Sequence, residues 1–206
     1  MKKGYIVFIF LQHLYLWAVG QESLKNGGWF SLGMRSSMSL LDEEGFGVGA
    51  GGQFRLQFSD RINSDWFADY FIVSADDKVK SEYYHIGWSI LYYPFKKLDD
   101  AKYKIKPYVL AGHCFDYNRK TVLAQPDITK GRWGSAVQAG IGTHFNLTKR
   151  FDISLLTQYM IHLTKSLELE ETEIGYSFST HKHSALEGHL LTTLSLNYKI
   201  CRLWHR

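Results

Sequence analysis

The sequence predicts an all-β fold: a closed antiparallel eight-stranded up-and-down transmembrane β-barrel. The clearest signal is the segment 133–163, where apolar residues alternate along two runs separated by a polar turn, Thr148-Lys149-Arg150. Strict alternation indicates a strand, because successive side chains point to opposite faces. Each run exceeds the usual length of about five or six residues and suits a tilted strand crossing a bilayer, which needs about 9–11. Aromatic residues, 16% of the chain, suit the girdles that such barrels form at membrane surfaces.

The start of the chain has the pattern of a cleaved secretory signal peptide. Two lysines follow Met1, a mostly apolar run comes next, and the small residues Ala18 and Gly20 precede Gln21. An N-terminal membrane anchor is the alternative, but the apolar run is shorter than the roughly 18 residues of a spanning helix. We therefore expect residues 1–20 to be removed and residues 21–206 to form the barrel domain.

Eight segments with alternating polarity divide the chain in order. They comprise residues 28–38, 45–58, 62–72, 84–92, 105–115, 133–147, 151–163 and 186–200. The second is the cleanest, with Phe46, Val48 and Phe54 on one face and glycines at alternate positions on the other. Glycine-rich runs also bind phosphate, but that motif needs a following helix, which this pattern lacks. Glycine on an inner face instead lets a narrow barrel curve without crowding.

The other segments show the same division into two faces. The third places Trp66 on the membrane side, and its other face alternates aspartates with Phe67 and Phe71; the fourth places Trp88 on the membrane side, opposite polar or small residues. The last places Leu194 and Leu196 on the membrane side and His189 on the inner side. The facing of the fifth segment stays open. The pattern therefore predicts an apolar outer surface and a polar interior.

Polar segments connect these strands. Ser59-Asp60-Arg61 and Thr148-Lys149-Arg150 are short turns, residues 73–81 and 118–132 are expected to be polar loops, and 164–185 is the longest connection. An even number of strands places both chain ends on one side, which is the periplasm for a secreted precursor. The two short turns then fall on the periplasmic side and the longest connection falls outside.

Taken together, these features resemble the small bacterial outer-membrane β-barrel family, built like the membrane domain of OmpA or like OmpX. The resemblance rests on the signal peptide, on the motif 45–61 and its echo 138–152, and on the closing alternation 190–200. It implies a place in the outer membrane of a Gram-negative cell envelope, with membrane lipid and the barrel assembly machinery as partners. One departure is the tail 201–206, because such barrels usually end on an aromatic residue.

Charged residues of both signs are expected in the lumen. This polar core comprises Arg35, Arg55, Asp65, Asp69, Asp152 and Lys199. Side chains fill the interior of an eight-stranded barrel, and a lone buried charge is costly. We therefore expect ion pairs that plug the lumen, with a narrow channel as the alternative. No nucleic-acid partner is expected, because the net charge is only +4.

No catalytic, cofactor-binding or metal-binding residues are expected. His181 and His183 lie near several glutamates, and imidazole with carboxylate binds divalent metals, but no spacing closes a site. A lipid-modifying enzyme is a further alternative, and its candidates are His113, His162 and His189 with Ser184 or Glu187. These residues lack the spacing of a catalytic triad. A soluble lipocalin-like barrel would need the opposite facing, with apolar residues inside.

The two cysteines are expected to remain unpaired. Cys114 lies toward the outer half of an ascending strand, and Cys201 follows the periplasmic end of the last strand. At a rise of roughly 3.3 Å per residue they are on the order of 20 Å apart, beyond the disulfide limit of about 7 Å.

A projecting hairpin is expected within the longest connection. Leu167 and Leu169 keep the phase of the seventh strand, and Tyr176 and Phe178 keep that of the last. Its turn would lie around residues 170–173, and a disordered loop is the alternative. Tyr176 and Phe178 would then offer a surface for strand addition by a protein partner. The expected role is therefore structural, adhesive or interaction-related through the external loops, without catalysis.

Overall fold

The computed structural model describes residues 27–41, 45–76, 78–95, 104–163, 168–172, 175–179 and 188–204. Ten strands occupy these residues: β1 (Trp29–Leu41), β2 (Gly45–Gln57), β3 (Ile62–Asp76), β4 (Val79–Tyr92), β5 (Ile105–Val122), β6 (Gln125–Asn146), β7 (Phe151–His162), β8 (Glu168–Thr172), β9 (Gly175–Ser179) and β10 (Gly188–Arg202). The described residues include no helix long and apolar enough to cross a membrane. The proposed signal peptide lies outside the described residues.

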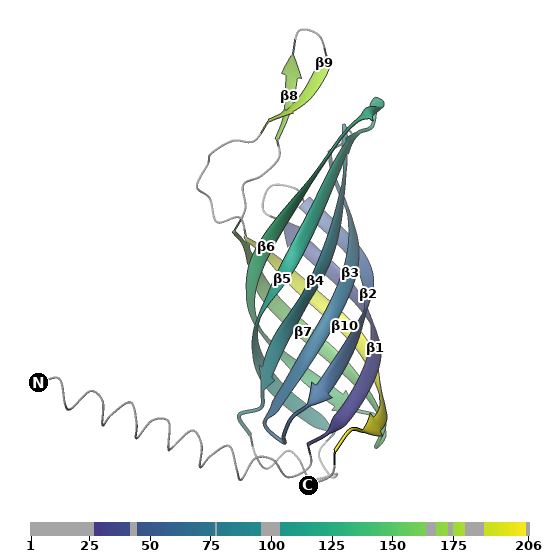
Figure 1. The fold of residues 1–206 in the computed structure, drawn as a ribbon, viewed down its shortest axis with the longest axis vertical. Helices are drawn as coiled ribbons and strands as arrows, with labels where there is room; N and C mark the ends of the chain where they lie inside the picture. Colours follow the sequence, from purple (N-terminus) through teal and green to yellow (C-terminus); the bar gives the residue numbers. More distant parts are fainter. Residues whose placement is uncertain are drawn as a thin grey trace, which may run out of the picture.

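Eight of the strands form one closed antiparallel barrel, as predicted. The order around it is β1-β10-β7-β6-β5-β4-β3-β2, so neighbours in sequence are neighbours in space except where β10 follows β7 (Figure 1). β1 and β10 close the barrel in a ladder that runs from Trp29↔Arg202 to Leu41↔His189. Closure removes the free edges of the sheet, which allows a sheet to sit in lipid without unpaired backbone groups.

Side chains alternate between the lumen and the outer surface, as the sequence predicts. On β1, Met34 is 78% exposed on the outside and Arg35 is 5% exposed on the inside. The facing of β5, left open by the sequence, is now assigned: Cys114 is buried inside and Phe115 is exposed outside. The outer surface is therefore apolar along the strands, and the lumen holds most of the buried polar side chains.

Aromatic rings form an arc on the outer surface. Tyr70, Tyr84, Tyr117 and Trp133 lie on four successive strands, β3 to β6. Adjacent ring centroids in this series are 4.9, 6.0 and 5.1 Å apart. Aromatic residues favour the membrane–water interface because one end of the ring is apolar and the other polar. The arc is therefore suited to mark one interface.

Two predicted loops are strands instead. β3 and β4 cover most of residues 73–81, and β5 and β6 cover most of residues 118–132. The prediction of polar loops was wrong because the pairing uses backbone groups: Asn118↔Arg132 and Lys120↔Lys130 continue the ladder with polar side chains. The β5–β6 hairpin therefore rises beyond the rest of the barrel, at the top of Figure 1.

The two ends of the barrel differ. One, here called the short-turn end, carries the turns 58–61 and 147–150 and both ends of the described chain. The two turns are equivalent: Ser59 Oγ accepts from the Ile62 N–H at 3.0 Å, and Thr148 Oγ accepts from the Phe151 N–H at 2.9 Å. The opposite end, where residues 123–124 join β5 to β6, is called the long-hairpin end.

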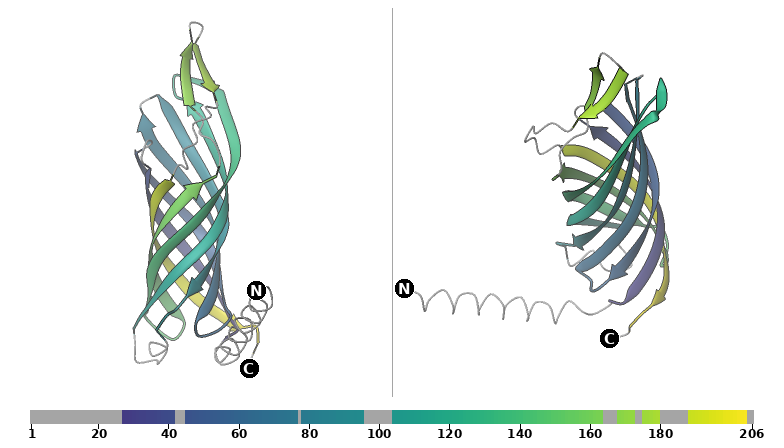
Figure 2. Two further views of the ribbon diagram at one scale, coloured as in Figure 1. Left: turned by 90° about the vertical axis from the view of Figure 1, so that its left-hand side faces the viewer. Right: turned by 45° about the horizontal axis from the view of Figure 1, so that its top comes forward.

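The hairpin predicted in the longest connection is present as β8 and β9. It forms a separate two-stranded sheet and does not prolong the ladder between β7 and β10, which is a correction (Figure 2). A second correction concerns its turn. Residues 170–172, predicted to be part of the turn, belong to strand β8. Residues 173–174, with Leu167, lie outside the described residues.

Both cysteines are free, in agreement with the prediction. Cys114 is buried in the lumen, and Cys201 is exposed near the short-turn end, opposite Phe30 of β1. The two thiols therefore report on two different environments of one molecule.

Glycines on the inner face of β2 make room for larger neighbours. Gly51 lies between Arg35 of β1 and Asp69 of β3 in register, and a Cβ at Gly51 would clash with Asp69 and with the Ala68 carbonyl. The missing side chain therefore lets Arg35 reach Asp69 across the intervening strand. At Gly52, on the outer face, the nearest atom to an added Cβ is the Gly33 carbonyl oxygen at 3.8 Å.

We expect Gly51→Ala to lower the free energy of unfolding by about 1–3 kcal/mol, the usual cost of overpacking. Gly52→Ala is the matched control, because the added methyl group makes only an ordinary van der Waals contact with the Gly33 carbonyl oxygen. Urea unfolding of the detergent-solubilised barrel, followed by tryptophan fluorescence, measures both. Equal effects at the two positions would contradict this explanation of the inner glycines.

Candidate functional site

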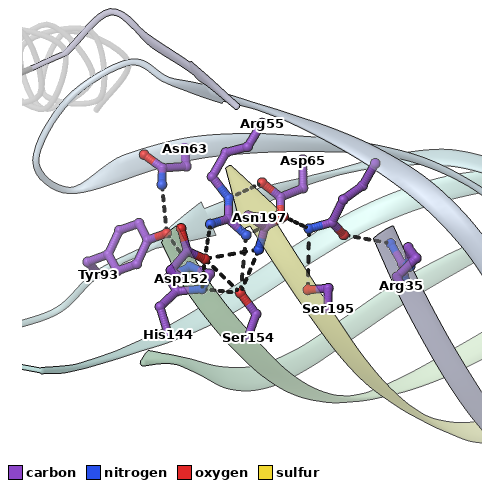
Figure 3. A network of polar contacts seen from close by, with 11 residues as sticks. Arg35, Arg55, Asn63, Asp65, Tyr93, His144, Asp152, Ser154, Ser195 and Asn197 are labelled. Carbon is purple, nitrogen blue, oxygen red and sulfur yellow. Dashed lines mark hydrogen bonds and ion pairs between the residues drawn. The ribbon is translucent and has the colours of Figure 1, made fainter. Parts of the chain in front are cut away.

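The lumen contains a charged network centred on Arg55. Arg55 forms a bidentate pair with Asp65, with Nε–Oδ1 at 2.7 Å and Nη2–Oδ2 at 2.9 Å, and Nη1 lies 3.2 Å from Asp152 Oδ1 (Figure 3). Asp65 is the register partner of Arg55 on β3, whereas Asp152 comes from β7 on another wall. All three are nearly inaccessible to solvent. The guanidinium thus ties two walls of the lumen together.

Polar side chains continue this network toward the short-turn end. Asn197 Nδ2 donates to Asp152 Oδ1 at 2.9 Å and to Ser154 Oγ at 3.2 Å. His144 bonds Ser154 through Nδ1 and the Tyr93 hydroxyl through Nε2, the latter at 2.8 Å. With Arg55 and Asp65, residues from five strands and from the end of β4 therefore meet in one hydrogen-bonded group (Figure 3).

Arg35 anchors a second part of the network. Its Nε lies 3.1 Å from Asp69 Oδ1, and its guanidinium lies 4.4 Å from the centroid of the Phe67 ring. Gln53 links the two arginine groups: its Oε1 accepts from Arg35 at 3.4 Å, and its Nε2 donates to Asn197. Both charges of the Arg35–Asp69 pair are buried, so each compensates the other.

A small void lies between the two arginine groups of the network. Between the two arginine groups, the space open to the centre of a water molecule is about 10 Å³, close to the minimum for one water. This void is bounded on one side by Leu91, Tyr108 and Leu110, which belong to an apolar cluster inside the barrel. Side chains from opposite walls of the barrel therefore contact one another at this level.

Five residues of the predicted polar core lie in this network. They are Arg35, Arg55, Asp65, Asp69 and Asp152. Lys199 is half-buried in β10, and its backbone N–H donates to the Arg150 carbonyl at 2.8 Å. Tyr176 and Phe178, the predicted partner surface, are half-buried in β9, a strand that contributes no residue to the lumen network.

A second polar cluster, toward the long-hairpin end of the lumen, was not predicted. It brings together His85, Asp116, His162 and His189 from four strands. His162 Nδ1 lies 2.8 Å from Asp116 Oδ2, and His162 Nε2 lies 3.0 Å from His189 Nδ1. The alternation in the sequence places all three histidines on the inner face. The sequence did not assign the faces of β5, so it did not indicate that Asp116, the group that joins the histidines, also points inward.

Three of the residues suggested for an enzyme, all histidines, lie in the described part of the chain. His162 and His189 do meet, but His113 lies on the alternate face of β5, beside Phe115, with ring centroids 4.9 Å apart. Ser184 and Glu187 lie outside the described residues, as do His181 and His183. Within the described part of the chain, no three His, Cys, Asp or Glu side chains are grouped to hold a metal ion.

The outer surface carries an apolar groove of about 750 Å³. Gly52 and Ala68 lie at its floor because they have little or no side chain, and Met34 borders it. The stacked rings of Phe54 and Trp66, with centroids 5.8 Å apart, form another border. The groove presents an apolar surface of the kind that lipid chains contact.

Comparison with solved structures identifies the class of fold. Neisserial surface protein A matches with a TM-score of 0.57 and 13% sequence identity, over 84% of this chain and 97% of that one. A major outer membrane protein from Thermus thermophilus matches with a TM-score of 0.56 and 11% identity, over 83% and 99%. No protein-family model and no curated protein sequence matches. The fold is therefore that of the small eight-stranded outer-membrane barrels.

We expect Arg55→Met to lower the free energy of unfolding by about 3–5 kcal/mol, because it leaves the carboxylates of Asp65 and Asp152 buried without their cation. Arg150→Met is the control, since Arg150 is exposed in a turn and donates only to the Tyr198 hydroxyl among the bonds described for its side chain. Urea unfolding in detergent compares the two. A loss no larger than that of Arg150→Met would contradict the structural role of the network.

Proposed function

We propose that this chain is an integral protein of the bacterial outer membrane, with a plugged lumen and an interaction surface at the long-hairpin end. The observation that carries the proposal is the Arg55 network, where the remaining void is about 10 Å³. A lumen filled by ion pairs stabilises the barrel without transporting solutes. The function then belongs to the parts that project beyond the membrane, and no catalytic step is assigned.

The outer surface supports a membrane position. Large apolar side chains such as Met34 and Ile141 are exposed along the strands, which suits lipid contact. The short-turn end, which carries both described chain ends, would face the periplasm, and the long-hairpin end would face outside. Membrane lipid and the barrel assembly machinery are the partners that this position implies.

The long-hairpin end supports an interaction role. β7 pairs with β6 only as far as the register pair Ala136↔His162, whereas β6 begins at Gln125. Within the described chain, residues 125–134 of β6 therefore have no ladder partner on that side. β9 lies beside this edge, because Lys130 Nζ donates to the Phe178 carbonyl at 3.1 Å. An open edge of this kind can accept a strand from a protein partner.

In planar lipid bilayers the purified barrel should show no large steady conductance at neutral pH, because the lumen has no continuous water path at the Arg55 level. A porin reconstituted under the same conditions provides the positive control. A stable channel of porin size would contradict the plugged lumen and favour the channel alternative.

The paired substitution Tyr176→Ser and Phe178→Ser should weaken capture of a protein partner by the barrel in native membranes. Leu203→Ser is the control, because Leu203 is exposed at the opposite end. The measurement is cross-linking on native membranes followed by mass spectrometry of the captured chains. Equal capture by all three proteins would exclude β9 as the partner surface.

A further inference from the structure

The second polar cluster closes the lumen toward the long-hairpin end. Its members, His85 of β4, Asp116 of β5, His162 of β7 and His189 of β10, are called the histidine latch here. The Asp116–His162 hydrogen bond at 2.8 Å joins β5 to β7, which β6 separates. The His162–His189 bond at 3.0 Å joins β7 to β10. His85 Nε2 lies 3.7 Å from Asp116 Oδ1 on the other side. The latch therefore connects four strands around one carboxylate.

The imidazole rings of the latch lie close together, and some of their ring nitrogens lack a hydrogen-bond partner. The ring centroid of His189 lies 4.9 Å from that of His162 and 6.1 Å from that of His85. Both ring nitrogens of His85, and Nε2 of His189, are buried without a hydrogen-bond partner. Buried polar atoms of this kind need an explanation, because an unpaired buried group costs free energy.

Other charged and titratable groups surround the latch. They are Arg35 of β1, Asp69 of β3, Tyr83 of β4 and Cys114 of β5. Asp69 already pairs with Arg35, so it is engaged elsewhere. β2 contributes inner glycines and β6 contributes Ala136 and Gln138 at the neighbouring inner positions. Asp116 is the carboxylate for which contacts with the latch imidazoles are observed, at 2.8 Å from His162 and 3.7 Å from His85.

Hydrogen-bond counting limits how many protons the latch can hold. The carboxylate of Asp116 accepts, so His162 Nδ1 must carry a proton. His162 Nε2 and His189 Nδ1 share a single proton between them, whichever ring carries it. The row of hydrogen bonds from Asp116 through His162 to His189 is therefore compatible with one positively charged imidazole, whose charge Asp116 balances. A second proton, on His189, would place two N–H groups against each other, and a proton on His85 would add like charge beside them.

We propose that the histidine latch is a pH-sensitive closure, which releases the contacts between β5, β7 and β10 when acid gives it a second proton. The proposal rests on the plugged lumen proposed above and adds regulation to it. Release opens the end of the lumen that faces the interaction surface, while the Arg55 network remains closed below. The consequence is local opening and not a channel. Bilayer conductance therefore tests the plugged lumen, and cysteine labelling tests the latch.

Cys114 supplies an internal probe of this opening. It is fully buried, and its Sγ donates to Asp116 Oδ1 at 2.9 Å, so it lies directly beside the latch. Cys201 is exposed near the short-turn end and reports the intrinsic reactivity of a thiol in the same molecule. The ratio of the two modification rates therefore measures exposure of Cys114, because changes in the reagent and in the sample affect both.

The experiment labels the full barrel in detergent with dipyridyl disulfide from about pH 7.5 to about pH 3.5, a range that contains the ordinary imidazole pKa of about 6.5. Mass spectrometry of the two cysteine peptides gives the rate ratio. The expected result is a rise of at least about tenfold in the Cys114 to Cys201 ratio at the acid end, as for opening of a local unit. Heat-modifiable gel migration monitors whether the barrel remains folded at each pH.

The double variant His162→Gln and His189→Gln tests the assignment, because glutamine keeps hydrogen-bonding groups but takes up no proton. Its rate ratio should stay flat across the range, whereas the control His113→Gln, on the alternate face of β5, should behave as the wild type. A flat wild-type ratio overturns the proposal. So does a rise that persists in the double variant, or one that coincides with loss of the folded band.

Discussion

The ladder between β1 and β10 is the constraint on which the remaining structure depends. Backbone groups in the hydrocarbon core of a membrane have no water to bond, so a spanning sheet must have no free edge. Antiparallel pairing from Trp29↔Arg202 to Leu41↔His189 meets this condition. Where the sheet is closed, successive residues on a strand face the outer surface and the lumen in turn, and the alternation of the sequence follows.

Closure of only eight strands also fixes what the lumen contains. The interior is narrow enough for side chains from facing walls to touch. Arg55 therefore reaches carboxylates on both β3 and β7, and the absence of a side chain at Gly51 lets Arg35 reach Asp69. The same narrowness brings His162 and His189 within 3.0 Å and excludes most solvent around them. The polar core and the histidine latch both result from the small width of the lumen.

The sequence predicts the faces well because alternation is local, and Arg55 and Asp65 already share the inner side of adjacent strands. It does not predict which inner residues meet across the lumen, since the Arg55–Asp152 contact depends on closure and on the stagger of the strands. It also fails at residues 118–132, where Lys120↔Lys130 pair outside the apolar band. Polar side chains mark the membrane boundary there, not the end of the strand.

A cysteine cross-link between β1 and β10 tests the closed barrel most directly. Ser36 and Leu194 are register partners, and such partners have Cα atoms about 4.5–5.5 Å apart, within disulfide range. In a background with Cys114→Ser and Cys201→Ser, the pair Ser36→Cys and Leu194→Cys should oxidise within one chain and shift its gel mobility. Ser36→Cys with Ile200→Cys, which is out of register, should not. Cross-linking of the second pair, or of neither, would contradict the closed barrel.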